Sequence, residues 1–394
     1  MARGEPMKIA GIIAEYNPFH TGHAWHIAQT RLLTGCDYVV VCMDGHFTQR
    51  GELALFSKWA RVRMALSCGA DAVFELPTLF ALRTADVFAR AGVTILGRLG
   101  CDALSFGCEI TDLNLIRTLS RIREHEPPEI SADIQNRLKS GQSHARARGE
   151  ATAANLGIAP KLLGQPNLIL GVEYIRWIDA LGLPMMPVAV PRQGRYHDAE
   201  MGEFASASAI RGAFLRGESP LALRYIPRDA QPWAIPEDLH PLDDLLLYRL
   251  RNMPLTALRA LPDISEGLEH RLCRLCRENS TCEALLDALK CKRYTHARLS
   301  RLLAHALLGT TQSALDAHPT PTFARLLGMR ANAGPLLREL HARASLPIAA
   351  SPYVIAEDEV FQFECRAADI WALAHNRPES RLPGREFTEK FVRL

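Results

Sequence analysis

The sequence lacks any apolar run long enough to cross a membrane. A spanning helix needs about eighteen or more consecutive apolar residues, and no run here approaches that length. The first six residues are short and polar, and the apolar run after them is brief, which is not the pattern of a secretory signal. We therefore expect a cytoplasmic protein.

An excess of charge of one sign is also missing. The 46 lysines and arginines are nearly balanced by 43 aspartates and glutamates, which leaves a net charge of +3. This balance gives no whole-molecule field that would attract nucleic acid, so any basic surface must be local. Hydrophobic residues make up 48 % of the 394 residues, as in soluble globular proteins, and the length predicts two or three domains.

Cysteine is sparse, and its ten residues stand singly except at Cys273 and Cys276. Free thiols are the simplest interpretation for a reducing compartment. With Cys282, Cys291 and His296 nearby, the pair could also hold a metal. However, it falls within an amphipathic run of helical spacing, whereas structural zinc pairs usually stand on turns. We predict buried thiols and no metal held by protein ligands.

Short apolar runs alternate with amphipathic ones over the first two hundred residues. This alternation is typical of a parallel α/β sheet whose strands are apolar throughout because helices cover both faces. We predict strands at 9–14, 38–43, 72–76, 103–106 and 185–190, and helices at 23–33, 57–68, 84–96 and 206–215.

Proline marks the end of this pattern. Five prolines stand between Pro220 and Pro241, and proline continues neither helix interiors nor central strands. Beyond them the apolar spacing is helical, with helices predicted at 242–252, 267–279, 282–289, 295–308 and 333–344. We therefore expect a parallel-sheet α/β domain over 7–230 and an all-helical domain over 231–394.

The most informative segment runs from Gly11 to His23. A strand ends near Ala14, a Pro-Phe turn follows, and His-Thr-Gly-His opens a helix. The unpaired N–H groups of a helix start suit a polyphosphate, and Gly22 lets a nucleotide approach the backbone closely. His20 and His23 share one helix face and can donate hydrogen bonds to an α-phosphate as charge develops there. The segment predicts a Rossmann-like nucleotidyltransferase that uses ATP to transfer an adenylyl group.

Alternatives to this interpretation are weaker. Two histidines three apart could form half of a metal site, but no third ligand stands at a suitable offset. A second segment, from Phe204 to Arg211, resembles the I-S-x-T-x-I-R sequence of nucleotidyltransferases that share the HxGH site. Its hydroxyls cap a helix, and its arginine can contact the leaving pyrophosphate. By itself the same segment could be a plain helix cap.

Together these residues resemble the tRNA(Met) cytidine acetate ligase family. The resemblance covers about 7–309 and is weaker around 323–328. It rests on the segments 11–26, 47–52, 69–77, 104–109, 166–174, 196–198 and 292–301.

This resemblance implies the reaction. Such enzymes activate acetate with ATP, which gives acetyl-adenylate and pyrophosphate, and pass the acetyl group to the exocyclic amine of the wobble cytidine of elongator tRNA(Met). Mg²⁺ would arrive with ATP, because it binds mainly through substrate phosphates. The residues implied or predicted to bind ATP are Ile13, Ala14, Glu15, Tyr16, Asn17, Pro18, Phe19, His20, Thr21, Gly22, His23, Ala24, Trp25, His26, Gly107, Asn167, Arg192, Ser206, Ser208 and Arg211, with His20 and His23 catalytic.

A basic segment at 290–301 is the candidate RNA contact. It holds five lysines and arginines and no acidic residue. A solvated helix face is the alternative. Flat side chains interleaved with cations suit RNA backbone and unstacked bases, so we expect tRNA contacts from Lys292, Arg293, Tyr294, Arg298 and Arg301.

Some positions depart from the family pattern. Asp44 and His46 stand where the family more often has serine and asparagine, and Leu53 replaces a proline. These changes surround the segment 49–52 without removing it, so they bear on fine substrate contacts more than on the reaction. The roles of Gln49, Arg50 and Lys58 stay open.

Two other functions fit part of the sequence. A small-molecule nucleotidyltransferase that joins AMP or CMP to a phosphorylated cofactor precursor would explain the HxGH segment but not the helical domain with its basic segment. A non-catalytic RNA-binding protein with a relic nucleotide fold would not need intact His20, Gly22 and His23.

Overall fold

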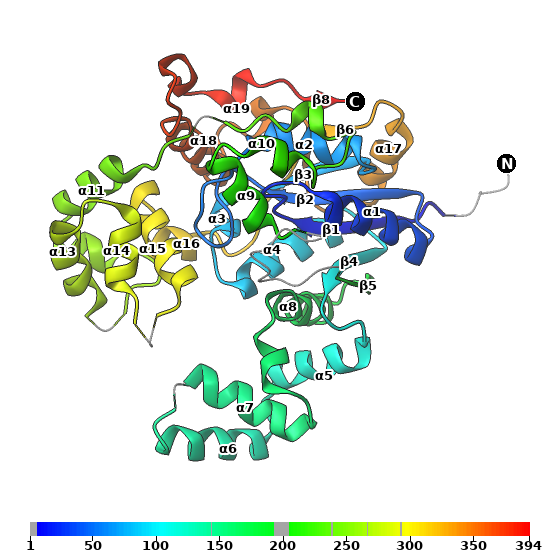
Figure 1. Cartoon of the computed structure of the whole chain (residues 1–394). Helices are drawn as coiled ribbons and strands as arrows, with labels where there is room; N and C mark the ends of the chain where they lie inside the picture. The colour runs from blue at the N-terminus through cyan, green and yellow to red at the C-terminus, as the bar shows by residue number, and fades with distance from the viewer. Residues whose placement is uncertain (1–5, 143, 193–204, 238, 266, 292–293) are drawn as a thin grey trace.

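The computed structural model describes residues 6–142, 144–192, 205–237, 239–265, 267–291 and 294–394. In this part of the chain an eight-stranded sheet has the order β5-β4-β1-β2-β3-β6-β7, with β8 beside β6 (Figure 1). The strands are β1 (Ile9–Ala14), β2 (Tyr38–Asp44), β3 (Ala72–Leu76), β4 (Ala103–Cys108), β5 (Met186–Pro191), β6 (Ala324–Met329), β7 (Ile348–Ala349) and β8 (Val392–Arg393). Strands β1 to β5 pair in parallel, whereas β6 runs antiparallel to β3.

Helices pack on both faces of the sheet, which is why its central strands are apolar at nearly every position (Figure 1). Val39 of β2 packs in one core with Val62, whereas its neighbour Val40 packs in a second core with Phe88. The helices around the sheet are α1 (Thr21–Thr34), α2 (Lys58–Ser67), α3 (Thr78–Ala81), α4 (Ala85–Arg98), α8 (Pro166–Ala180), α9 (Ala207–Leu215), α10 (Ser219–Leu223), α17 (Gly334–Arg343), α18 (Glu359–Ala372) and α19 (Arg385–Thr388).

The predicted elements of the first two hundred residues are confirmed to within two residues at each end. Ser57 caps α2, because its Oγ atom accepts a hydrogen bond from the backbone N–H of Ala60 at 3.2 Å. Helix α1 ends at Gly35, which has a φ of 62°. A glycine adopts this left-handed conformation without a steric penalty, so it stops the helix.

An arm of three helices, which the apolar pattern does not predict, extends from the sheet between β4 and α8 (Figure 1). It consists of α5 (Leu113–Glu124), α6 (Pro128–Lys139) and α7 (His144–Leu156). The arm has a small core of its own, formed by Ile122, Ile130, Ile134, Ala147 and Ala151.

A second helical unit, here called the lobe, covers residues 243–317 and lies on the other side of the molecule from α17 (Figure 1). Its helices are α11 (Asp243–Asn252), α12 (Leu255–Arg259), α13 (Leu268–Glu278), α14 (Cys282–Leu289), α15 (His296–Leu308) and α16 (Gln312–Ala317). They surround a separate core that consists mainly of leucines.

The helical unit is shorter than the predicted span of 231–394, because the chain returns to the sheet after the lobe. The segment 324–329, apolar except for Arg325, forms β6, which lies between β3 and β7. At Gly328 an added Cβ would lie 2.7 Å from side-chain atoms of both Val392 and Val62, so only glycine allows this packing. No helix among the described residues has the length and apolar content needed to span a membrane.

A buried group of charges fastens the returning segment to the sheet. The Lys58 ammonium contacts Glu75, lies 3.2 Å from Glu364 and lies 2.6 Å from Glu386. Arg325 lies 3.0 Å from Glu75 and also contacts Glu386. Burial alone would lower the pKa of Lys58, but the three carboxylates raise it, so the ammonium stays charged. We call these five residues the ion cluster.

Replacing Lys58 with methionine tests the ion cluster. The change leaves three carboxylates buried without the ammonium, and breaking a buried pair in this way costs about 3–5 kcal/mol. We expect a loss of that size in the free energy of unfolding, measured by urea denaturation and circular dichroism. Lys8→Met, at an exposed lysine, is the matched control and should change it by less than about 0.5 kcal/mol. Equal stability of both variants would show that the carboxylates do not depend on Lys58.

Candidate nucleotide-binding site

A cavity of about 450 Å³ lies at the carboxyl ends of β1, β4 and β5, where Ala14, Gly107 and Pro191 line it. Open parallel sheets bind ligands outside this edge. The start of α1, the first turn of α8, the start of α9 and helix α15 of the lobe complete the walls. The cavity therefore lies where the sheet unit meets the lobe.

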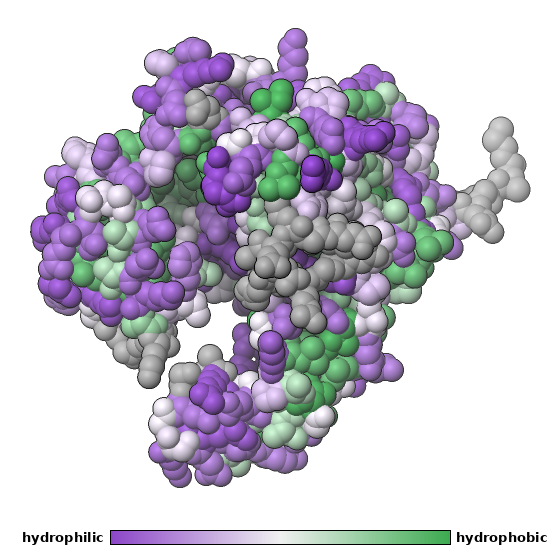
Figure 2. Space-filling model, viewed as in Figure 1, coloured by the Kyte–Doolittle hydropathy of each residue, from purple (hydrophilic) through white to green (hydrophobic). Residues whose placement is uncertain are grey.

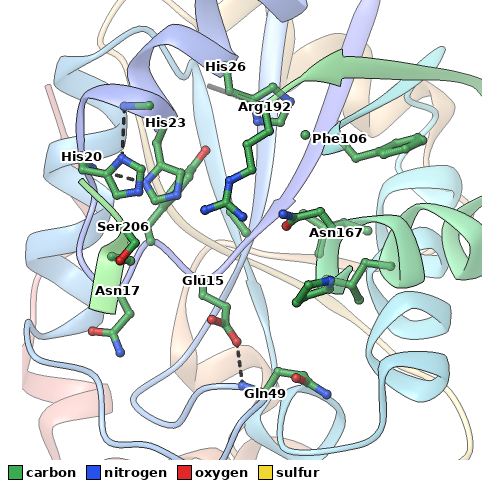
Figure 3. Close-up of a pocket in the computed structure, with 18 of the residues that line it drawn as sticks. Glu15, Asn17, His20, His23, His26, Gln49, Phe106, Asn167, Arg192 and Ser206 are labelled. Carbon is green, nitrogen blue, oxygen red and sulfur yellow. Dashed lines mark hydrogen bonds between the residues drawn. The ribbon is translucent and has the colours of Figure 1, made fainter. Parts of the chain in front are cut away.

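The two histidines of the HxGH segment are held by the backbone of α1 (Figure 3). His20 is the N-cap of the helix, and its Nδ1 atom accepts a hydrogen bond from the backbone N–H of Gly22 at 3.1 Å. The backbone N–H of His20 donates to Nδ1 of His23 at 3.2 Å, and the two rings stack with centroids 3.8 Å apart. A neutral imidazole that accepts at Nδ1 carries its proton on Nε2. Both rings therefore offer Nε2–H as a donor.

Burial keeps these rings neutral. It lowers the pKa of His20 to about 3, and the Arg192 guanidinium acts in the same direction. Burial, together with the neighbouring His20, His26 and Arg192, lowers the pKa of His23 well below its usual value. The unfolded chain binds these protons more readily, so the stability that the neutral rings contribute is lost as the pH falls below about 6.5.

Gly22 has a structural role that the sequence does not show. A Cβ at this position would lie 2.9 Å from Cε1 and 3.0 Å from Nδ1 of the His20 ring. Glycine is therefore needed for His20 to fold back over the first turn. The packing of the His20 ring therefore requires glycine at position 22 whether or not a nucleotide is bound.

Most of the residues predicted to bind ATP line the cavity, and the exceptions are Pro18, Phe19 and Ala24. Phe19 is fully buried and packs edge-on against Tyr16, with ring centroids 4.8 Å apart. Phe19 therefore supports the Pro-Phe turn before α1 through its buried ring and does not line the cavity. The residues brought together at the cavity are Ile13, Ala14, Glu15, Tyr16, Asn17, His20, Thr21, Gly22, His23, Trp25, His26, Gly107, Asn167, Arg192, Ser206, Ser208 and Arg211.

Glu109, for which no role was predicted, organises one wall. Its Oε1 atom accepts a hydrogen bond from Nδ2 of Asn167 at 2.7 Å, and its Oε2 atom accepts one from the backbone N–H of Leu168 at 2.9 Å. Arg192 lies 3.9 Å from the same carboxylate. Glu109 directly follows β4, and the only signals for it in the sequence were its place after a predicted strand and within the segment 104–109 of the family resemblance.

The segment that contains Arg211 both caps a helix and lines the cavity. The Oγ atom of Ser206 accepts from the backbone N–H of Ala209 at 3.2 Å, as an N-cap does. Arg211 donates to the backbone carbonyl of Asn17 at 2.6 Å and to Glu52 at 2.8 Å. This segment can therefore be both a helix cap and part of the nucleotide site.

A loop at 47–53 connects the cavity to the lobe. The backbone N–H of Gln49 donates to Oε1 of Glu15 at 2.9 Å (Figure 3). Gly51 has a φ of 85°, and a Cβ there would lie 2.6 Å from the backbone of Ser300 and Arg301 in α15. Only glycine permits this approach, which brings Arg301 to the cavity.

Comparisons with known proteins identify the family. Residues 7–385 match the family model described as HIGH Nucleotidyl Transferase. The tRNA(Met) cytidine acetate ligase of Bacillus subtilis (strain 168) is 37 % identical over 94 % of this chain and 94 % of that protein. The protein of the same name from Thermoanaerobacter sp. (strain X514) is 35 % identical over 98 % of this chain and 100 % of its own. The chain belongs to the tRNA(Met) cytidine acetate ligase family.

Solved structures agree with this assignment. Thermotoga maritima TmcAL bound with alpha-thio ATP is similar with a TM-score of 0.89 and 27 % identity, over 98 % of this chain and 99 % of that one. The apo form of the same protein has a TM-score of 0.90 and 28 % identity, over 98 % and 100 % of the two chains. The fold of this member of the tRNA(Met) cytidine acetate ligase family is therefore shared along its length.

In this family member, the basic segment is only partly placed. Lys292 and Arg293 lie outside the described residues. Arg298 stacks on the Tyr294 ring at 4.9 Å and donates to the backbone carbonyl of Asp263 at 2.7 Å. Arg301 donates to the Asp263 carboxylate at 3.3 Å. These side chains make contacts within the lobe, and RNA binding by the segment stays a prediction.

The residues that depart from the family pattern lie behind the cavity and do not line it. Asp44 pairs with the buried Arg61 at 2.7 Å, and the His46 ring stacks on Trp371 at 4.2 Å. His46 also lies near Glu364 and Glu386 in an arrangement that could hold a metal ion. However, the Lys58 ammonium already lies beside both carboxylates, as described for the ion cluster. Lys58 is thus a buried structural residue.

The two paired cysteines lie on α13, as the helical spacing predicts. Cys276 is buried, Cys273 is partly buried, and both are free thiols. The Sγ atom of Cys276 donates to the backbone carbonyl of Cys273 at 3.3 Å, and Arg277 donates to Sγ of Cys273 at 3.1 Å. The absence of a protein-held metal stays a prediction.

Proposed function

We propose that this protein uses ATP to activate acetate as acetyl-adenylate and then acetylates the exocyclic N4 amine of the wobble cytidine of elongator tRNA(Met). The observation that carries the proposal is the pair of neutral histidines at the start of α1, both with Nε2–H as donor, in a member of this ligase family. Such an enzyme belongs with its tRNA substrate in the cytoplasm.

The geometry suits the activation step. The start of α1 provides backbone N–H groups and a partial positive charge for phosphate. As the acetate oxygen attacks the α-phosphorus, negative charge grows on the phosphate oxygens, and His20 and His23 can donate to them without changing protonation state. Arg192 and Arg211 line the same cavity and can balance the charge of the departing pyrophosphate. Mg²⁺ would be carried by the phosphates themselves.

The chain divides between the two half-reactions. The sheet unit, 7–230 together with 324–394, would bind ATP, and the lobe would bind tRNA. Hydrophilic side chains cover most of the visible face of the lobe (Figure 2). Its helix α15 also reaches the cavity through Ala297 and Arg301, so an RNA held on the lobe would lie beside the adenylate.

Labelled acetate tests the proposal directly. Incubation with ATP should give labelled acetyl-adenylate without tRNA and labelled tRNA when elongator tRNA(Met) is added. A small-molecule nucleotidyltransferase would incorporate no acetate, and a non-catalytic RNA-binding protein would bind tRNA without labelling it. Either of these results would contradict the proposal.

Removing either histidine should abolish activation. Loss of one donor aimed at developing phosphate charge costs roughly 3 kcal/mol in the transition state, which is more than a hundredfold in rate. We expect His20→Ala and His23→Ala to lose acetate-dependent pyrophosphate release while keeping the circular dichroism of the wild type. His341→Ala, at an exposed histidine of α17, is the control and should retain full activity. Wild-type turnover in either cavity variant would exclude the assigned roles.

Replacing the basic pair Lys292 and Arg293 should affect only the affinity for tRNA. A cation that neutralises an RNA phosphate releases ions on binding, so each one removed should lower the slope of log affinity against log salt by about one. We expect Lys292→Ala with Arg293→Ala to weaken filter binding of tRNA and to leave pyrophosphate release unchanged. The control replaces Arg338 and Lys390, an exposed arginine and lysine outside the lobe. Unchanged tRNA affinity in the basic-pair variant would move the RNA site elsewhere on the lobe.

A further inference from the structure

Glu15 brings a partly buried carboxylate into a cavity that otherwise suits phosphate. It directly follows β1, and Figure 3 shows its side chain directed toward the loop at 47–53, away from His20 and His23. The other acid of this wall, Glu52, is neutralised by Arg211 at 2.8 Å. Glu15 instead accepts a hydrogen bond from a neutral donor, the backbone N–H of Gln49. A negative carboxylate repels triphosphate, so this side chain is better suited to serve the other substrate.

The surroundings of Glu15 favour a proton acceptor. Burial raises the pKa of Glu15, although the Gln49 N–H and the Arg50 charge act in the opposite direction. The other groups that face it are Glu52 and Arg211, Asp44 of β2, Tyr174 of α8, and Arg61, which donates to the Glu15 backbone carbonyl at 2.6 Å. A carboxylate with a raised pKa is better matched to take up a proton near neutral pH.

Glu15 also shares its cavity with residues of both α1 and the lobe. His20 and His23 of α1 line the cavity, and Ala297 and Arg301 of the lobe line it as well. The loop that contacts Glu15 through Gln49 also packs against α15 at Gly51. A nucleobase that enters alongside the lobe would therefore share one cavity with Glu15 and the adenylate.

We propose that Glu15 accepts the proton of the cytidine exocyclic amine during acetyl transfer, an inference that rests on the proposed function. The amine nitrogen attacks the acetyl carbonyl and a C–N bond forms. The C–O bond between the acetyl group and the adenylate phosphate breaks, and its electron pair leaves with AMP. The proton released by the nitrogen passes to the Glu15 carboxylate and then to water when the products leave.

Synthetic acetyl-adenylate separates this step from activation. Glu15→Gln keeps a carbonyl oxygen that can accept the Gln49 N–H, so the loop stays in place, but it accepts no proton. We expect single-turnover transfer to tRNA, normalised to bound adenylate, to fall by about a hundredfold or more. In the wild type the rate should rise with pH until Glu15 is ionised, and Glu15→Gln should lose this rise. Glu357→Gln, at an exposed glutamate, is the matched control and should behave as the wild type.

A conservative variant keeps the proposal testable if Glu15→Gln does not fold. Glu15→Asp retains an ionisable group with a lower ordinary pKa. The rise of its transfer rate with pH should therefore persist but shift to lower pH. Transfer by Glu15→Gln at the wild-type rate, a pH-dependent rise that persists in it, or an unshifted rise in Glu15→Asp would each overturn the proposal. Failure of the proposed function itself would look different, because the wild type would then transfer no acetyl group from acetyl-adenylate to tRNA.

Discussion

The site depends on hydrogen bonds between the first turn of α1 and its own two histidines. A helix start usually leaves N–H groups that polar caps, water or ligands satisfy. Here the Nδ1 atom of His20 satisfies Gly22, and the Nδ1 atom of His23 satisfies His20. The same bonds fix both protons on Nε2. The hydrogen bonds that cap the helix therefore also make the Nε2–H groups of His20 and His23 available as donors. Burial keeps both imidazole rings neutral and thus preserves these hydrogen bonds and tautomers.

Two sets of contacts join the lobe and the segment after it to the sheet. At Gly51 the loop at 47–53 lies against the backbone of α15, which brings the lobe to the cavity. Behind the sheet, the ion cluster joins α2 and β3 to β6, α18 and α19. The lobe is an insertion between two parts of one sheet unit, and the close approach at Gly51 holds it beside the cavity. A tRNA bound to the lobe would be positioned relative to the cavity by these same contacts.

The sequence predicts those features that are encoded locally. Strands β1 to β3 are apolar except for Asp44 and Glu75, and Ser57, Gly35 and the HxGH turn mark helix ends by their own chemistry, so these elements were found. The pairing of β6 with β3 joins residues about 250 positions apart and depends on tertiary packing, which no local pattern reports. For the same reason Glu109 was not recognised as the partner of Asn167, nor Lys58 as part of a buried cluster. The arm was not found because its charged helices bury only a narrow stripe of residues.

The two half-reactions place opposite demands on one cavity. Activation brings together a triphosphate and acetate, both negative, and so requires donors and cations, which the start of α1, Arg192 and Arg211 would supply in the proposed function. Transfer begins after pyrophosphate has left, when the cavity has lost most of its negative charge and a neutral amine must lose a proton. Coulomb repulsion between a carboxylate and phosphate falls with distance and with the charge removed. An acid held away from the histidines, as Glu15 is, therefore interferes least with the first step and becomes useful in the second. Because the start of α1 and helix α15 of the lobe line one cavity, both chemistries can take place in one site.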